Sequence, residues 1–220
     1  LGVIRLLTEN GLRMGVAEGE LLDFFADRLK VQQREAGVRH DLIDAVFALG
    51  GEDDLVRLLA RVHALQAFID TDNGANLLAG YKRAANILKK EDWHGIEGEI
   101  ARTGEEDPLA LVDDPDMKAV VDAKMAERHA RELSYTPEPA EKALIEALDA
   151  AEPQASEAIE KEDFAAAMSA LASLRAPIDA FFEEVTVNDE NPEKRAARLD
   201  LLARFRVAVH NVADFSKIEG

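Results

Sequence analysis

The side chains that could act as nucleophiles or bases are few, and their spacing does not suggest a catalytic centre. The chain has no cysteine, and its five histidines, at positions 40, 63, 94, 129 and 210, are scattered. A hydrolase or transferase needs a nucleophile, a base and a polarising group held together. None of the motifs G-x-S-x-G, Walker A, G-x-G-x-x-G or H-E-x-x-H is present. The sequence therefore predicts no catalytic residue.

Two groups of residues have a spacing that could bind a metal ion, but neither is complete. His210 and Asp214 are four residues apart, as in many metal-binding helices, yet two ligands alone do not hold zinc. Asp113, Asp114 and Asp116 lack the regular alternation and terminal glutamate of a calcium loop. A surface pair and a solvated acidic loop are the favoured interpretations, and we expect no metal site.

The most informative chemistry is a basic stripe between Lys82 and Lys90, which contains four basic residues and no acidic one. At 100° per residue, its polar members fall within one helical arc of roughly 120°. They are Lys82, Arg83, Asn86, Lys89 and Lys90. Lysine and arginine on a rigid face suit phosphate groups, and a neighbouring amide suits base edges. The plain alternative is a solvated helix face whose last lysines oppose the helix dipole. Arg83 and Asn86 could instead be structural and tie helices together.

Two weaker basic sets accompany the stripe. The first consists of Arg28, Lys30, Arg34 and Arg39, followed by His40. The second is Arg195 with Arg198, in the last helical pattern of the chain. We include the arginines and lysines of both sets among the candidate RNA-binding residues. Each set also has a structural alternative, since Arg28 could bond another helix and the late arginines could pair with acidic segments.

The overall charge restricts these candidates to local surfaces. The chain carries 26 basic and 44 acidic side chains, a formal charge of −18, which disfavours non-specific binding to DNA or RNA. Half of the net charge comes from residues 91–116, with ten acidic side chains and one basic. Screening confines each interaction to about 8–10 Å, so a local basic surface can still act.

No apolar run approaches the roughly 20 residues needed to span a bilayer, so we expect no membrane contact. The first residues resemble neither a signal peptide nor a natural start, and we expect a fragment of a longer, cytoplasmic protein.

Nearly every segment has the apolar periodicity of a helix, and no run alternates as a strand does. Glycine, proline and capping residues set the expected limits. The expected helices are 18–35, 39–49, 53–69, one beginning after 71–73, 116–132, 137–151, 164–185 with a kink or break at Pro177, and 193–212. The fold class is therefore all-α, a multi-helix bundle with one acidic loop or linker at 91–116.

Several blocks of the sequence, in order, are similar to one known family. They are LLDFFADRLKVQQREAGVRHDLIDAVFAL, DDLVRLLARVHALQAFI, GANLLAGYKRAANILKKED, EKALIEAL and the stretch from LASLRAPIDAFFEEV to FSKI. Together they resemble the C-terminal portion of the bacterial glycyl-tRNA synthetase beta subunit, including its DALR-like helical anticodon-binding domain. The similarity covers the chain except for residues around 91–135.

The resemblance implies a division of the chain and a role. Residues 1–70 would be a helical body segment of the beta subunit, and 71–220 the anticodon-binding domain. The fragment would bind tRNA(Gly) and support the ATP-dependent attachment of glycine to it. The alpha subunit would hold the ATP and Mg²⁺ site in a heterotetramer of two alpha and two beta subunits, so the fragment alone would need no cofactor.

Two other interpretations stay open from the sequence alone. One is an all-α scaffold that docks protein, and the other is the anticodon-binding domain of an arginyl-type synthetase. The blocks DFFADRL and DLIDAVFAL favour the glycyl beta subunit over the second.

Overall fold

Helices make up all the regular structure of the residues that can be described. A computed structural model of the chain describes residues 18–50, 54–93, 133 and 135–219, with only the backbone for 18–26. The elements are α2 (Glu18–Glu35), α3 (His40–Phe47), α4 (Leu55–Ile69), α5 (Asp72–Lys90), α8 (Pro139–Glu160), α9 (Phe164–Ala172), α10 (Arg175–Glu184), α11 (Pro192–His210) and the 3₁₀ turn η1 (Phe215–Lys217). The all-α prediction is confirmed.

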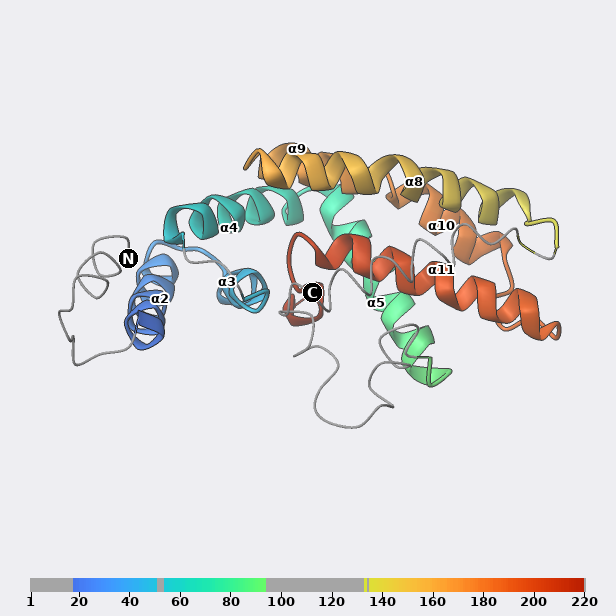
Figure 1. The fold of residues 1–220 in the computed structure, drawn as a ribbon, viewed down its shortest axis with the longest axis horizontal. Helices are drawn as coiled ribbons and strands as arrows, with labels where there is room; N and C mark the ends of the chain where they lie inside the picture. Colours follow the sequence, from blue (N-terminus) through green and yellow to red (C-terminus); the bar gives the residue numbers. More distant parts are fainter. Residues whose placement is uncertain (1–17, 51–53, 94–132, 134, 220) are drawn as a thin grey trace.

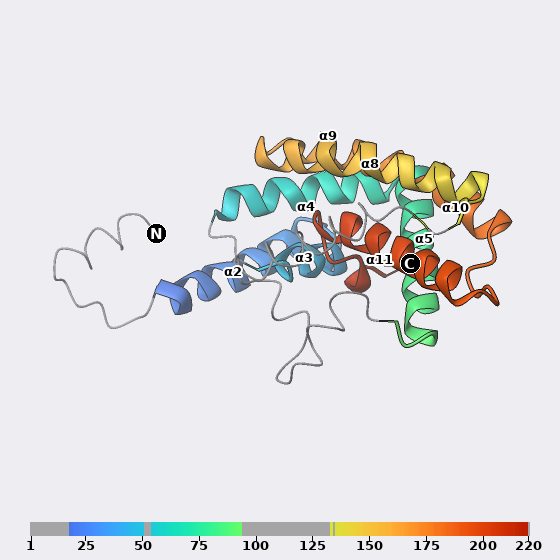
Figure 2. The same ribbon diagram turned by 45° about the vertical axis from the view of Figure 1, so that its right-hand side comes forward.

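The helices form layers that α5 crosses. In Figures 1 and 2, α8 and α9 lie along one side of the molecule, with α4 next to α9 and α11 beneath them. Helix α5 runs transversely past α11 and contacts α4, α10 and η1 as well. Its second half, which carries the basic stripe, lies far from the layer of α8 and α9 in both views.

The corner between α4 and α5 shows why α5 begins where it does. Thr71 caps the helix, since its hydroxyl accepts a hydrogen bond from the Gly74 N–H at 3.1 Å, as its residue type predicts. A Cβ atom at Gly74 would lie 2.1 Å from the carbonyl oxygen of Phe68. Only glycine allows the two helices to approach this closely, so this corner fixes the direction of α5.

The apolar arc of α5 is its core face, as the periodicity predicts. Leu77, Tyr81, Ala84 and Leu88 are buried, and the Tyr81 ring lies 5.6 Å from that of Phe215 in η1. Burial of this face leaves the basic stripe on the other side of the same helix. The core therefore holds the basic stripe on a well-anchored helix.

Two prolines test the expected helix limits, with different outcomes. The prediction that a helix ends at Ala151 is wrong, because α8 continues through Pro153 to Glu160. Ala155 and Ala158, beyond the proline, are buried, and this packing outweighs the lost backbone hydrogen bond. The predicted break near Pro177 is confirmed: α9 ends at Ala172, and Pro177 lies in the first turn of α10, where no helical N–H is needed.

The end of the described chain packs back onto α3. The Asp214 N–H donates to the Ala45 carbonyl at 2.9 Å, and the Glu219 N–H donates to the Asp41 carboxylate at 2.8 Å. Phe215 and Ile218 are buried between these contacts. Helices α3 and α4 and the later helices thus share one core, while the boundary expected at residue 70 stays a prediction. Most of the expected acidic loop, 94–116, and the expected helix 116–132 lie outside the described residues.

Candidate nucleic-acid interface

The cationic face of α5, which we define as Lys82, Arg83, Asn86, Lys89 and Lys90, is placed mostly at the surface. Arg83, Asn86, Lys89 and Lys90 are exposed, and Lys82 is half-buried. Their spacing of three and four residues puts them on neighbouring turns of one helix. A row of basic side chains around a central amide therefore lies on one side of α5, as the sequence predicts.

Arg83 is anchored to a neighbouring helix. Its guanidinium carbon lies 4.3 Å from the centre of the Phe182 ring, and its Nη2 donates to the Phe182 carbonyl at 3.3 Å. Phe182 belongs to α10, so Arg83 links α5 to α10. Both partners are uncharged, and the positive charge of Arg83 is not cancelled by them.

The end of α5 is joined to the start of α11 by one carboxylate. Glu91, the C-cap residue of α5, forms an ion pair with Arg195 and accepts a hydrogen bond from the Asn188 amide at 3.4 Å. Arg195 stays exposed, but its charge is largely neutralised by Glu91. The prediction that Arg195 binds RNA remains a prediction, and the ion pair weakens it.

Arg198 must be removed from the candidate set, because its side chain is 0% exposed. Its guanidinium donates to the Thr186 carbonyl at 2.7 Å and to Asp189 at 2.9 Å. It also contacts Glu138 at 2.6 Å and Glu141 at 3.4 Å. Three carboxylates surround one buried cation, so Arg198 has neither the exposure nor the free charge to bind a phosphate.

The carboxylates around Arg198 are held by further contacts. The Tyr135 hydroxyl donates to Glu141, and burial together with this hydrogen bond raises the pKa of Tyr135 above its usual value. The Asn191 N–H donates to Asp189 at 2.9 Å and lowers the pKa of that carboxyl, with a smaller contribution from Arg198. The cluster therefore ties α8, α11 and the loop before α11 together.

The sequence interpretation does not single out a second buried arginine, Arg204. Arg204 is 5% exposed and donates to Asp149 at 2.7 Å and to Glu152 at 2.6 and 2.8 Å. The sequence carried a clear signal only for Arg198, which lies on the same helical face as Leu202, Phe205 and Val209 at 100° per residue. An arginine on an apolar face is buried and needs carboxylate partners.

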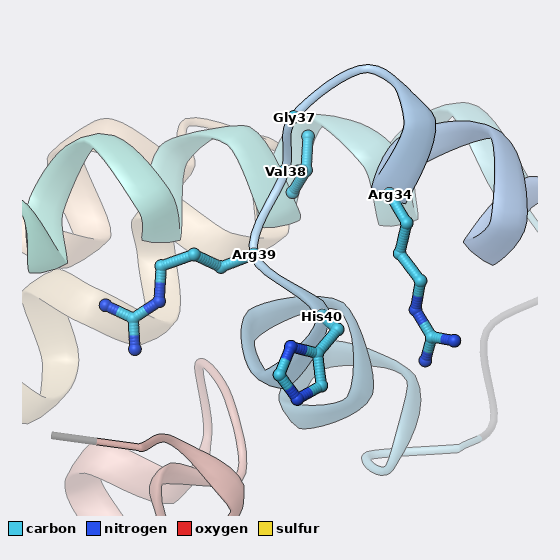
Figure 3. A pocket seen from close by; sticks show the side chains of 5 residues that line it. All are labelled: Arg34, Gly37, Val38, Arg39 and His40. Carbon is cyan, nitrogen blue, oxygen red and sulfur yellow. The ribbon is translucent and has the colours of Figure 1, made fainter.

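The other basic set lies at the corner between α2 and α3, beside a shallow hollow of about 470 Å³. Arg34, Gly37, Val38, Arg39 and His40 line this hollow, and Figure 3 shows the Arg34 and Arg39 side chains extending to opposite sides of His40. The two guanidinium groups therefore do not converge on one point.

Much of the charge in this set is already paired. Arg34 forms an ion pair with Asp44 at 3.4 Å. Arg39 pairs with Asp41 and donates to the Glu219 carbonyl at 2.7 Å. Burial opposes the ionisation of Asp41, but hydrogen bonds from Arg39 and the Glu219 amide prevail and lower the pKa of Asp41.

Two members of the set lie nearer the start of α2. The Lys30 ammonium lies 5.1 Å from the centre of the Phe47 ring, and Arg28 is exposed. This set is weaker than the cationic face of α5, because contacts within the protein engage most of its members. It stays in the list of candidates as a prediction.

The described residues contain neither a metal-binding cluster nor a membrane-spanning helix. They contain no group of three or more histidine, cysteine or acidic side chains that could hold a metal ion. His210 lies 3.7 Å from Asp214, and His94 and His129 fall outside the described part of the chain. None of the described helices is long and apolar enough to cross a membrane.

A comparison with protein families identifies the class. The family described as the DALR anticodon binding domain matches residues 77–219, which include α5 from Leu77 onward and every later described helix. The chain belongs to this family.

Comparison with individual proteins shows that the chain is similar to one kind of subunit. The chain is 44% identical to the glycine–tRNA ligase beta subunit of Rhodospirillum centenum, 46% to that of Phenylobacterium zucineum and 45% to that of a Ruegeria species. Each alignment includes 100% of this chain but only 29–30% of the relative. The chain thus spans less than a third of the length of these proteins.

Proposed function

We propose that the chain is the anticodon-recognising, tRNA-binding part of a glycine–tRNA ligase beta subunit, and that the cationic face of α5 contacts the tRNA. The single observation that carries this proposal is the match of the anticodon-binding family to residues 77–219, which include that face. Lys89 and Lys90 are exposed at the end of a helix whose other side is core. They would hold phosphates of the anticodon stem or loop.

The distribution of charge supports the same face. Lys142 and Lys161 are exposed on and next to α8, but each pairs with a glutamate one helical turn away. Lys89 and Lys90 follow a segment of α5 without acidic residues. RNA would therefore be repelled by most of this acidic chain and attracted at α5, within the short range that screening allows.

The proposal extends to the rest of the enzyme through the names of the relatives. The chain would act with an alpha subunit, in a cytoplasmic assembly of two alpha and two beta subunits. The ATP and Mg²⁺ site for glycine activation would lie on the alpha subunit. Arg28, Lys30, Arg34 and Arg39 would add secondary contacts to tRNA, outside the anticodon-binding family match.

Binding of tRNA(Gly) to the complete enzyme tests the proposal, with Lys89→Glu/Lys90→Glu in the beta subunit. We expect the affinity at low salt to fall about tenfold or more, and the slope of log K against log salt to become less steep by roughly 1.5–2, since two phosphate contacts are lost. Lys142→Glu/Lys161→Glu makes the same change of charge on the far side of the molecule and serves as the control. Equal losses in both variants would refute a specific role for the α5 face.

A further inference from the structure

The contact between Arg83 and Phe182 presents a flat group to solvent. The guanidinium carbon lies 4.3 Å from the centre of the Phe182 ring, and the side chain is also tied to the Phe182 carbonyl at 3.3 Å. Phe182 is 9% exposed, whereas Arg83 is exposed. The guanidinium thus lies over the ring, while the side chain stays exposed to a partner.

These two contacts fix the orientation of a side chain that is otherwise flexible. A free arginine loses rotamer entropy when it binds a ligand, and this cost lowers affinity. Because Arg83 is already held against α10, less of that entropy remains to be lost on binding. The arrangement therefore resembles a prepared binding surface more than a solvated side chain.

The chemistry of this surface favours a nucleobase over a phosphate. Unpaired RNA bases stack on aromatic rings and on arginine planes. One donor of Arg83 is already used by the Phe182 carbonyl, and the exposed Glu183 and Glu184 follow Phe182 on α10 and repel phosphates. Lys89 and Lys90 lie on the last turn of α5, where the next carboxylate, Glu91, is engaged by Arg195, and they suit phosphate groups better, as compact charges on flexible stems.

An amide stands one helical turn from the guanidinium. Asn86 is exposed and lies three residues after Arg83 on α5, so their Cβ atoms are about 5–6 Å apart. This spacing is within the reach of a single base. The amide can donate and accept hydrogen bonds at once, as recognition of a base edge requires.

We propose that the guanidinium of Arg83, held over the Phe182 ring, is the stacking platform for one unpaired base of the bound RNA, and that Asn86 reads the edge of that base. The inference rests on the proposed function and adds which residues recognise a base. Lys89 and Lys90 then hold the neighbouring phosphates. Base recognition and backbone binding are thereby separated along one helix.

Fluorescence of a base analogue tests the platform directly. The complete enzyme is saturated with tRNA(Gly) carrying 2-aminopurine at one anticodon position at a time. We expect one position to change its emission on binding and to lose that change with Arg83→Lys, which keeps the charge but removes the planar surface. The same variant lowers the affinity for tRNA(Gly) about 5- to 10-fold.

A second variant tests the reading of the base. Asn86→Ala is expected to reduce the preference for tRNA(Gly) over a tRNA with a changed anticodon about tenfold, with little change in affinity for the mismatched tRNA. Arg61→Lys is the matched control, since Arg61 lies 4.9 Å from the Phe164 ring in a buried contact between α4 and α9. It should leave both the emission and the preference unchanged.

The outcomes separate the two proposals. If the enzyme prefers its tRNA by the anticodon, and Arg83→Lys leaves the 2-aminopurine signal as in the wild type, the platform is refuted while the proposed function stands. If the wild type shows no anticodon preference and Lys89→Glu/Lys90→Glu binds tRNA normally, both are refuted. Loss of the signal in Arg83→Lys, with an unaltered Arg61→Lys control, supports the platform.

Discussion

Arg198 on α11 and Arg83 on α5 are both anchored to other parts of the fold, but by opposite kinds of partner. Three carboxylates surround Arg198, whose side chain is 0% exposed. Arg83 is held by an uncharged ring and a backbone carbonyl, and it is exposed. The partners differ in their effect on charge: carboxylates neutralise Arg198 within the fold, whereas the ring and the carbonyl orient Arg83 without neutralising it.

The largest effect on stability is expected at Arg198, whose charge is neutralised by carboxylates within the fold. Arg198→Met should lower the free energy of unfolding by about 3–5 kcal/mol, because Glu141, which is 1% exposed, is left buried without its cation. Urea denaturation followed by circular dichroism measures this. A loss below about 1 kcal/mol would mean that Glu141 can take a proton or reach water at little cost, and the interior cluster would lose its structural importance.

Replacement of Arg204 should lower the free energy of unfolding by less, because its carboxylate partners are more exposed than Glu141. Arg204→Met leaves Asp149 and Glu152 unpaired, but their side chains are 60% and 31% exposed and can be hydrated. We expect a loss of about 1.5–3 kcal/mol in the same urea titration. If Arg204→Met proved as damaging as Arg198→Met, the burial of the carboxylate partners would not be what sets the cost.

The arginines also show what could be predicted from the sequence and what could not. The two sides of α5 followed from periodicity, because core and polar residues separate cleanly between Leu77 and Lys90. The periodicity also places Arg198 on the apolar face of α11, but the sequence interpretation treats it as an RNA-binding residue and not as a buried one. Its partner Glu141 lies 57 residues away, and no local pattern pairs the two.

The same limit applies to the proposed platform and to α8. Phe182 lies 99 residues from Arg83, so the contact that orients the guanidinium arises only from the packing of α10 on α5. The length of α8 was underestimated because Pro153 is a strong local stop signal, whereas burial of Ala155 and Ala158 depends on distant helices. Local periodicity predicts which helix faces are apolar, whereas tertiary packing determines which polar side chains are buried or held by another helix.

Arg39 is intermediate between the buried Arg198 and the exposed Arg83. Arg39 is half-buried and pairs with Asp41, which also accepts from the Glu219 N–H. We expect Asp41→Asn to lower the free energy of unfolding by about 1–2 kcal/mol at neutral pH, since charge-assisted hydrogen bonds are lost.

The pH dependence provides a separate check on Asp41. The pKa of this carboxyl is lowered in the folded state, so its stabilising contribution is present above its unfolded pKa of about 3.9 and is lost as the pH falls through the folded value. The wild type should therefore lose stability below about pH 4 more steeply than Asp41→Asn. Parallel curves for the two proteins, measured by urea denaturation from pH 7 to pH 2.5, would contradict the assigned contact.

The smallest effect on stability is expected at Lys89 and Lys90, where the expected effect on RNA binding is largest. Lys89→Gln/Lys90→Gln should change the free energy of unfolding by about 0.5 kcal/mol or less at physiological salt, because both side chains are exposed and only their interaction with the helix dipole is lost. The same variant should weaken tRNA(Gly) binding by the complete enzyme about fivefold or more at low salt. Arg198→Met should show the reverse pattern, with reduced stability and near-normal affinity at temperatures where it is folded. If the lysine variant instead lost stability and kept its affinity, exposure on α5 would not mark the residues that bind RNA in this fold.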